Sequence, residues 1–301
     1  MIKVNSLSGG KTSSYMAVHY AADHNVFSLV CIDRPDAAPK DKAISIYVKE
    51  KLAPFVGEFG EFIATAEDDT TLRVMMDLEQ LIGSEITWVR GLSFDSVIDE
   101  GTKTRLPSWA RRYCTTQMKM LPIFLWWWNN IGERCEMRIG FRFDEFSRME
   151  NFFNGDPNNF AIPVQCSTRG DRRQKFHTYN WRRCHFPLVK DGITKQMIED
   201  YWSGRTIPGT LFEEQREIKF PSISNCIGCF HKKPETLAAM ADIHSEKFRW
   251  FIDQESKGMG TWLDNNLKYQ HIMDNRHDIG KEVIFEAKAG YATCDSGGCT
   301  D

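Results

Sequence analysis

Short apolar runs alternate with longer segments of helical period along the first 81 residues. Residues 26–33 (VFSLVCID) are continuously apolar up to the final Asp, which is typical of a strand buried on both faces of a parallel sheet. Runs at residues 2–5 and 61–66 predict two further strands, and residues 15–23, 39–52 and 71–81 predict helices. Strands that alternate with helices indicate right-handed crossovers and therefore a parallel α/β sheet.

The rest of the chain is less regular. Residues 84–110 show no sustained period, because glycine and proline interrupt it, and we expect a loop-rich insertion over the site. Residues 123–130 predict a helix whose tryptophans, Trp126 to Trp128, we expect in the core rather than stacked on a base. Further predictions are a strand at 136–140, an inserted segment at 149–183, and helices at 194–202 and 234–254. We therefore expect a first domain of residues 1–205 and a C-terminal helical region of residues 206–301.

The composition is that of an ordinary globular protein. Of the 301 residues 42% are hydrophobic and 26% are charged, and a formal net charge of −3 gives no global indication of a nucleic-acid binder. The first residues enter a predicted strand directly, so we expect neither a signal peptide nor a membrane span. Nine cysteines in such a chain indicate reduced thiols, metal ligands or redox chemistry, and we expect a cytoplasmic protein.

Residues 7–14 (LSGGKTSS) join the first predicted strand to the first predicted helix. The adjacent Gly9 and Gly10 let the backbone curl around a phosphate, at which the N–H groups and dipole of the new helix then point. Ser8, Thr12 and Ser13 would add hydroxyl donors to this site, and Lys11 a positive charge. The loop predicts a phosphate site, and the alternative is an ordinary glycine-rich turn.

Two familiar nucleotide loops are excluded by spacing. The loop Gly-x-x-x-x-Gly-Lys-Ser/Thr would need a glycine at residue 5, which is Asn5. The dinucleotide fingerprint Gly-x-Gly-x-x-Gly is absent from this position.

Three other charged residues follow predicted strands, whose carboxyl ends carry the ligand sites of parallel sheets. Asp33 ends the first long apolar run, where it would hold a ribose or adenine group or cap a turn. Arg142 and Arg148 stand in residues 140–148 (GFRFDEFSR) with two acids. The arginines would clamp a phosphate, or all four residues would form a surface ion-pair cluster.

The inserted segment 149–183 mixes positive and aromatic side chains. They are Arg169, Arg172, Arg173, Lys175, Phe176, Tyr179, Trp181, Arg182 and Arg183. This mixture suits a phosphodiester chain with exposed bases, and the alternative is a solvated loop.

Close cysteine pairs mark the C-terminal region. The turn Cys226-Ile-Gly-Cys229 places two thiolates on one metal ion or cluster edge, and a second pair, Cys294 and Cys299, stands in the glycine-rich tail. The turn alone is compatible with an iron–sulfur cluster, with zinc or with a redox dithiol. All four together would make a closed zinc site. We expect the remaining cysteines outside the motifs to be buried as small hydrophobes: Cys31, Cys135, Cys166 and Cys184.

Four motifs, in order, resemble those of the PP-loop ATP pyrophosphatase superfamily, and within it the phosphoadenylyl/adenylyl sulfate (PAPS) reductase family. They are the Ser-Gly-Gly loop at 8–13, Cys-Thr-x-x-x-Lys-x-x-Pro at 114–122, Gly-x-Arg-x-x-Glu-x-x-Arg at 140–148 and His-Phe-Pro-Leu at 185–188. They span most of residues 1–205. The resemblance implies an adenine nucleotide α-hydrolase-like (Rossmann-like) fold, with helices on both faces of a parallel sheet. ATP or a related adenine nucleotide would be bound by the loop, Asp33 and Lys119.

The lysine in the loop looks more like the ATP-cleaving, sulfurtransferase-like branch, which includes tRNA thiolation enzymes and DNA phosphorothioation sulfurtransferases. That branch often has Asp where this chain has Thr12. The acid that would have a magnesium or phosphate role is therefore absent from this position.

The resemblance also implies a [4Fe-4S] cluster. Adenylyl sulfate reductases have cluster cysteines at the positions of Cys114, Cys226 and Cys229, whereas Thr115 stands where they have a second adjacent cysteine. Some tRNA thiolation enzymes likewise hold a cluster with three cysteines. We therefore expect these three as ligands, with the fourth position open or filled by Cys294 or Cys299, and zinc as the alternative.

These observations predict an enzyme that adenylates an acceptor with ATP and delivers sulfur to it. Lys11, Arg142 and Arg148 would act on the phosphates, with Mg²⁺ as a further cofactor. The acceptor would be a nucleobase or nucleic acid such as tRNA or DNA, and partners would include a sulfur or electron donor protein and a second copy in a homodimer. One alternative is an adenylyl sulfate reductase in which Cys299 attacks sulfur. Another is a non-catalytic, zinc-stabilised nucleotide-binding protein.

Overall fold

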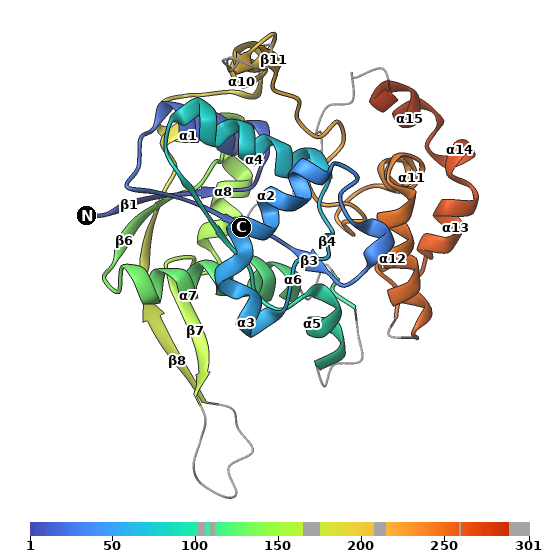
Figure 1. Ribbon diagram of the computed structural model, residues 1–301, viewed down its shortest axis with the longest axis horizontal. Helices are drawn as coiled ribbons and strands as arrows, with labels where there is room; N and C mark the ends of the chain where they lie inside the picture. The colour runs from blue at the N-terminus through green and yellow to red at the C-terminus, as the bar shows by residue number, and fades with distance from the viewer. Residues whose placement is uncertain (101–105, 109–111, 165–174, 208–214, 259, 289–301) are drawn as a thin grey trace, which may run out of the picture.

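The protein is described by a computed structural model for residues 1–100, 106–108, 112–164, 175–207, 215–258 and 260–288 (Figure 1). Its centre is a five-stranded, all-parallel sheet of order β5-β2-β1-β6-β9. The strands are β1 (Lys3–Leu7), β2 (His24–Ser28), β5 (Ile86–Val89), β6 (Cys135–Arg138) and β9 (Arg182–His185). The strand order reverses between β1 and β6, and such a switch point opens a ligand crevice beyond the carboxyl ends of the strands.

Both faces of the sheet are covered. Inward-facing residues alternate along the strands, so that Leu7 and Phe27 join one buried cluster while Val4 and Val26 join another. On the first face lie α1 (Lys11–His19), α2 (Lys42–Leu52), α4 (Asp69–Ile82) and α10 (Lys195–Trp202). On the second face lie α7 (Leu121–Asn130) and the hairpin of β7 (Asn159–Val164) and β8 (Lys175–Asn180). The parallel α/β sheet with helices on both faces is confirmed.

Two strand predictions are wrong, because residues 26–33 divide into β2 and the separate β3 (Cys31–Ile32), and residues 61–66 contain no strand of the main sheet. Residues 61–66 contain only β4 (Ala64–Thr65), which pairs antiparallel with β3 outside the main sheet. The strand beside β2 is instead β5, in the segment expected to be a loop-rich insertion. After β5 the chain continues into α5 (Phe94–Glu100), so that expectation is wrong for both elements. The carbonyl of Val30 accepts hydrogen bonds from the Thr65 hydroxyl (2.7 Å) and the Ala66 N–H (3.1 Å), which anchor β4 away from the main sheet.

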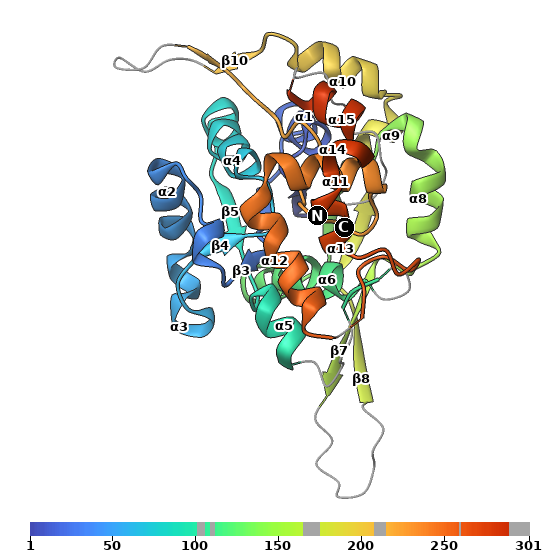
Figure 2. The ribbon, with the colours of Figure 1, turned by 90° about the vertical axis from the view of Figure 1, so that its right-hand side faces the viewer.

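The inserted segment is partly core. It contains the end of α8 (Phe146–Phe153), the β7–β8 hairpin, which projects away from the sheet in both ribbon views, and the start of β9 (Figure 2). Trp181 is fully buried and Arg182 is 1% exposed, with its guanidinium 4.7 Å from the Trp181 ring, so a nucleic-acid role for these two residues is wrong. Arg169, Arg172 and Arg173 lie outside the described residues, as does the side chain of Lys175.

The tryptophan and cysteine predictions are confirmed in part. Trp127 is 4% exposed, but Trp128 is 49% exposed, and its placement in the core was wrong. Cys31 and Cys135 are buried, Cys184 is half-buried, and Cys166 lies outside the described residues. Burial raises the pKa of the Cys31 thiol to about 12 and that of Cys135 to about 11.

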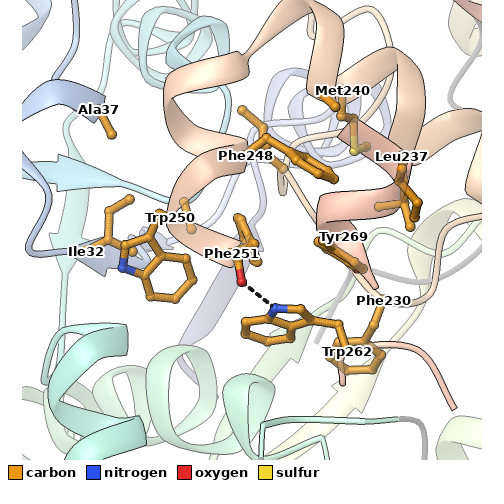
Figure 3. Packing of buried hydrophobic residues seen from close by; sticks show 14 of the residues in the cluster. Ile32, Ala37, Phe230, Leu237, Met240, Phe248, Trp250, Phe251, Trp262 and Tyr269 are labelled. Carbon is orange, nitrogen blue, oxygen red and sulfur yellow. Dashed lines mark hydrogen bonds between the residues drawn. The ribbon is translucent and has the colours of Figure 1, made fainter. Parts of the chain in front are cut away.

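The C-terminal helices share a core with the sheet region. They are α11 (Pro234–Ile243), α12 (Ser245–Ser256), α13 (Tyr269–Asp274), α14 (Arg276–Ile279) and α15 (Lys281–Lys288). Residues 234–254 thus form two helices, which meet at the non-helical backbone of His244. Figure 3 shows Ile32 and Ala37 from the first half of the chain in the same cluster as Trp250, Phe251 and Trp262. The indole N–H of Trp262 donates a hydrogen bond to the Phe251 carbonyl (2.8 Å).

The remaining short elements are η1 (Pro35–Ala37), η2 (Ala53–Phe55), α3 (Val56–Phe59), α6 (Tyr113–Thr115), η3 (Thr116–Met120), η4 (Phe143–Glu145), α9 (Pro187–Lys190), β10 (Thr206–Ile207) and β11 (Arg216–Glu217). In the described part of the chain no helix has the length and apolar character needed to cross a membrane.

Candidate functional site

The glycine loop connects β1 to α1 at the switch point of the sheet. Gly9 has φ +77°, and a Cβ at this residue would overlap Cγ2 of Thr71 on α4. Only glycine therefore satisfies both the left-handed backbone and the close approach of α4. Gly10 is the N-cap of α1 and brings no side chain to cap it, so the first-turn N–H groups of α1 lie at an end suited to an anion.

The serine hydroxyls close the loop on itself. The Ser13 hydroxyl accepts the Ser8 N–H (3.2 Å), donates to the Gly10 carbonyl (3.2 Å) and lies 3.1 Å from the Ser8 hydroxyl. Both serines are less than a tenth exposed. Lys11 is exposed, and its carbonyl accepts the Trp202 indole N–H (2.9 Å). The serines thus shape the loop, while the Lys11 ammonium remains accessible to a ligand.

The loop after β6 meets the glycine loop across the switch point. A Cβ at Gly140 would lie 3.3 Å from both N and Cα of Ser13, so the two backbones are nearly in contact. Nη1 of Arg142 lies 3.4 Å from the Thr12 hydroxyl. The structure therefore brings Arg142 to the start of α1, as the phosphate-clamp hypothesis requires.

Glu145 ties the two predicted arginines together. It accepts the Arg142 backbone N–H (3.1 Å) and pairs with the Arg148 guanidinium (2.7 Å). Arg142 also pairs with Asp144 (3.1 Å), and the Arg148 guanidinium lies 4.7 Å from the Phe141 ring. The ion-pair cluster is thus present, and within it Arg142 is the arginine that reaches the loop.

Asp33 follows β3 and is exposed. Its carboxylate accepts a hydrogen bond from the Ser93 hydroxyl, and its backbone N–H donates to Asp95 (2.7 Å). These contacts tie the end of β3 to the start of α5 and fit the turn-capping alternative for Asp33.

Lys119 lies on η3, a π-helical turn of a type that is frequent at functional sites. Its ammonium is 3.2 Å from Oε1 of Glu67, whose side chain is completely buried. Lys119 is also part of the wall of a pocket that contains the predicted metal ligands.

All three predicted metal ligands line this one pocket. Cys114 comes from α6, and Cys226 and Cys229 come from the turn before α11. The other lining residues are Val30, Phe94, Arg112, Thr115, Met118, Lys119, Gly228, Phe230, His231, Phe251 and Trp262. We call this site the cysteine pocket. Its wall is largely apolar and also includes the basic residues Arg112 and Lys119.

The conformation of the Cys-x-x-Cys turn is set by its neighbours. Gly228 has φ +65°, and a Cβ there would lie 2.6 Å from the Phe251 ring. The Tyr269 hydroxyl donates to the Gly228 carbonyl (3.0 Å). Burial, reinforced by the nearby Cys229, holds the pKa of Tyr269 well above its usual range, so this hydroxyl stays a donor.

The segment before this turn binds the glycine loop. The Asn225 side-chain amide donates to the Ser8 carbonyl, and the Asn225 carbonyl accepts the Asp68 N–H (2.7 Å). Cys226 forms a β-bridge with Glu67, and the Ile227 N–H donates to Ala66 (2.9 Å). One short stretch therefore connects the glycine loop, the end of β4 and the cysteine pocket.

Three thiols in one apolar pocket suit an iron–sulfur cluster in number and in chemistry. Among the described residues no three His, Cys, Asp or Glu side chains are placed to hold one metal ion. A single zinc ion lies about 2.3 Å from each sulfur and needs its ligands close together, whereas in a cluster each cysteine binds its own iron. Cys294 and Cys299 lie outside the described residues.

Comparisons with protein-family models, with curated proteins and with solved structures give no match for this chain.

Two residues of this site were missed in the sequence. His231 follows the Cys-x-x-Cys turn by two positions, and that spacing, Cys-x-x-Cys-x-His, was a usable signal. Asn225 gave no signal, because its partner is a backbone carbonyl brought close only by the fold.

Proposed function

We propose that the protein is a PP-loop enzyme of the PAPS reductase family, with an adenine nucleotide α-hydrolase-like fold, that uses ATP to adenylate an acceptor and then delivers sulfur to it. The observation that carries this proposal is the link made by Asn225. It holds the glycine loop against the segment that supplies Cys226 and Cys229. A phosphate-binding loop joined directly to a thiol pocket suits a reaction that couples nucleotide cleavage to sulfur chemistry.

The nucleotide would sit at the switch point. Its released pyrophosphate would be held by the first-turn N–H groups of α1 and by Lys11. Arg142, which reaches Thr12, would neutralise charge that develops on the phosphates, an electrostatic role that needs no proton transfer. Arg148 would position Arg142 through their shared partner Glu145. With Thr12 in place of the usual acid, Mg²⁺ would be held mainly by the phosphates themselves.

The reaction has two balanced steps. An acceptor oxygen attacks the α-phosphorus of ATP, the bond to the β-phosphate oxygen breaks, and pyrophosphate leaves. Hydrosulfide, supplied by a donor protein, then attacks the acceptor carbon or phosphorus, and AMP leaves with the former acceptor oxygen. A cluster bound at Cys114, Cys226 and Cys229 would supply a binding site for the sulfur that is transferred.

A nucleic-acid acceptor is supported by aromatic groups on the outer face of α7 and the hairpin. Trp128 is 49% exposed. The Trp128 ring lies 4.9 Å from the ring of Tyr179, so the two form one aromatic surface. Unpaired bases stack on such surfaces.

The test uses the full chain purified without oxygen. We would incubate it with α-labelled ATP, sulfide and either bulk tRNA or duplex DNA, and measure AMP and pyrophosphate. We expect both products in equal amounts, only with an acceptor, and not from a Lys11→Ala variant.

The same preparation offered adenylyl sulfate or its 3′-phosphate tests the reductase alternative. Sulfite release without pyrophosphate under any condition would reverse the ranking, and Cys299 would then be the candidate nucleophile. Nucleotide binding with neither product would favour the non-catalytic alternative.

A further inference from the structure

We infer that His231 is the fourth protein ligand of the iron–sulfur cluster, beside Cys114, Cys226 and Cys229. The inference rests on the proposed function, because it takes the cysteine pocket as the cluster site. It assigns the fourth position to a residue next to the Cys-x-x-Cys turn, in place of an open site or a tail cysteine.

Position is the first argument. His231 lines the same pocket as the three cysteines, and no residue from outside the described parts of the chain is needed to complete the set. The Lys232 N–H donates to the Cys229 carbonyl (2.9 Å), which closes a turn over Phe230 and His231. Phe230 is 4% exposed and its ring lies 4.6 Å from the imidazole, so a buried side chain anchors the histidine.

Chemistry is the second argument. Thiolates and imidazoles are both established ligands of iron–sulfur clusters, and histidine in place of cysteine raises the reduction potential. Thr115 also lines the pocket, but a hydroxyl is a hard donor that binds cluster iron poorly. Among the residues around the three cysteines, His231 is therefore the one whose side chain suits iron.

Electrostatics is the third argument. Thiolates in a pocket walled by Val30, Phe94 and Trp262 carry charge that water solvates poorly. Arg112 also lines the pocket, whereas the Lys119 ammonium already pairs with the buried Glu67 carboxylate (3.2 Å). A neutral imidazole as the fourth ligand adds no further negative charge, whereas a fourth thiolate would.

The test compares variants of the full chain, all purified without oxygen, by iron and acid-labile sulfide content, electron paramagnetic resonance and reduction potential. We expect about four iron atoms per chain in the wild type. In His231→Ala the content should fall to about three, with the signal of a three-iron cluster after mild oxidation. In His231→Cys it should return to about four, at a lower potential, because a thiolate replaces the imidazole.

Two controls accompany these variants. His277→Ala removes a histidine on α14 whose side chain is 66% exposed, and it should leave the cluster unchanged. The double variant Cys294→Ser/Cys299→Ser should also retain about four iron atoms. If His231→Ala fails to fold, the recovery of the cluster and the lowered potential in His231→Cys decide the question.

The inference is overturned if the tail double variant loses the fourth iron while His231→Ala keeps it, or if His231→Cys keeps the wild-type potential. In both cases the cluster exists and the proposed function stands. A wild type that contains zinc or no metal overturns the inference together with the cluster. A wild type with the cluster but without AMP and pyrophosphate overturns the proposed reaction and leaves the ligand assignment intact.

Discussion

The side-chain amide of Asn225 donates a hydrogen bond to the backbone carbonyl of Ser8, 217 positions earlier in the chain. In a trans peptide the carbonyl oxygen and the following N–H point in opposite directions. By holding the Ser8 carbonyl, Asn225 therefore turns the N–H of Gly9 away from itself. The same residue accepts the Asp68 N–H through its own carbonyl, so the loop is held from a rigid position.

Replacing Asn225 by Ala should weaken nucleotide binding. The peptide between Ser8 and Gly9 would lose the bond that orients it, and an oriented charge-assisted N–H donor is worth about 1.5–3 kcal/mol, or roughly 10–100-fold in affinity. Isothermal titration calorimetry with ATP measures the change.

Two further variants sharpen this measurement. Asn225→Asp loses the same donor and adds a negative charge near the phosphate site, so it should bind ATP more weakly than Asn225→Ala. Asn130→Ala removes another amide-to-carbonyl bond, within α7 to the Trp126 carbonyl (2.7 Å), and should bind like the wild type. Equal ATP affinity in wild type and Asn225→Ala would show that the loop needs no such support.

Lys11→Ala and Gly10→Val should abolish adenine-nucleotide binding without unfolding the protein. The first change removes an exposed positive charge. The second adds a side chain whose Cβ lies only 3.3 Å from Nδ2 of Asn225 and whose methyl groups would block close approach of a phosphate. Calorimetry gives the affinity, and circular dichroism gives the fold. If both variants bind ATP like the wild type, the loop is not the nucleotide site.

Gly9→Ala should destabilise the protein by about 1–3 kcal/mol, because φ is +77° and the new Cβ would overlap Cγ2 of Thr71. Thr71→Ser removes that methyl group, so the double variant should recover part of the loss. Urea unfolding of the four proteins forms a double-mutant cycle. Strict additivity of the two changes would mean that strain in the backbone, rather than the contact with Thr71, accounts for the loss.

The parts of the fold that were predictable were those governed by local patterns. Alternating apolar runs and helical segments gave the parallel sheet, and the glycine pair after the first strand gave the loop. The strand β5 was missed, because four residues between the turn at Gly83 and Arg90 carry too short a pattern. Its place beside β2 is decided by packing, in which Trp88 lies against Phe27 (4.9 Å).

The candidate site also combines residues that local patterns predict with residues that only the fold brings together. Cys226 and Cys229 are a local signal, but the approach of Cys114 to them depends on the whole fold and was expected only through the family resemblance. The burial of Arg182 was also not predictable. Its buried guanidinium is stabilised by a hydrogen bond to the distant Pro157 carbonyl (2.7 Å) and by the Trp181 ring. A buried arginine is tolerated only with such partners.

Stability should depend on pH through Asp68, the N-cap of α4. Burial would raise the pKa of this carboxyl, but the His244 imidazole (3.3 Å) and the Thr70 N–H (2.9 Å) outweigh burial and lower it below its usual 3.8. The unfolded state therefore binds the proton more tightly. The stabilisation is complete above the unfolded pKa and is lost as pH falls through the folded value.

Asp68→Asn keeps an N-cap oxygen and removes the charge. It should lower the free energy of unfolding by about 1 kcal/mol at pH 5.5, and the difference should be smaller at pH 3. Urea titrations at both pH values measure this. A difference of the same size at both values would place the effect in packing rather than in charge.

Cys114→Ser should remove or halve the metal content of the anaerobically purified protein, because Cys114 is the ligand that the fold brings to the Cys-x-x-Cys turn from 112 positions earlier. Iron and zinc analysis and the visible absorption spectrum measure the outcome. Cys31→Ser is the matched control, since that thiol is buried, has its pKa raised to about 12 and lies outside the wall of the cysteine pocket.

Under the zinc alternative, the ligands are Cys226, Cys229, Cys294 and Cys299, so truncation before Cys294 loses the metal and Cys114→Ser retains it. A colourless wild type with one zinc per chain, unchanged by Cys114→Ser, would contradict the cluster assignment.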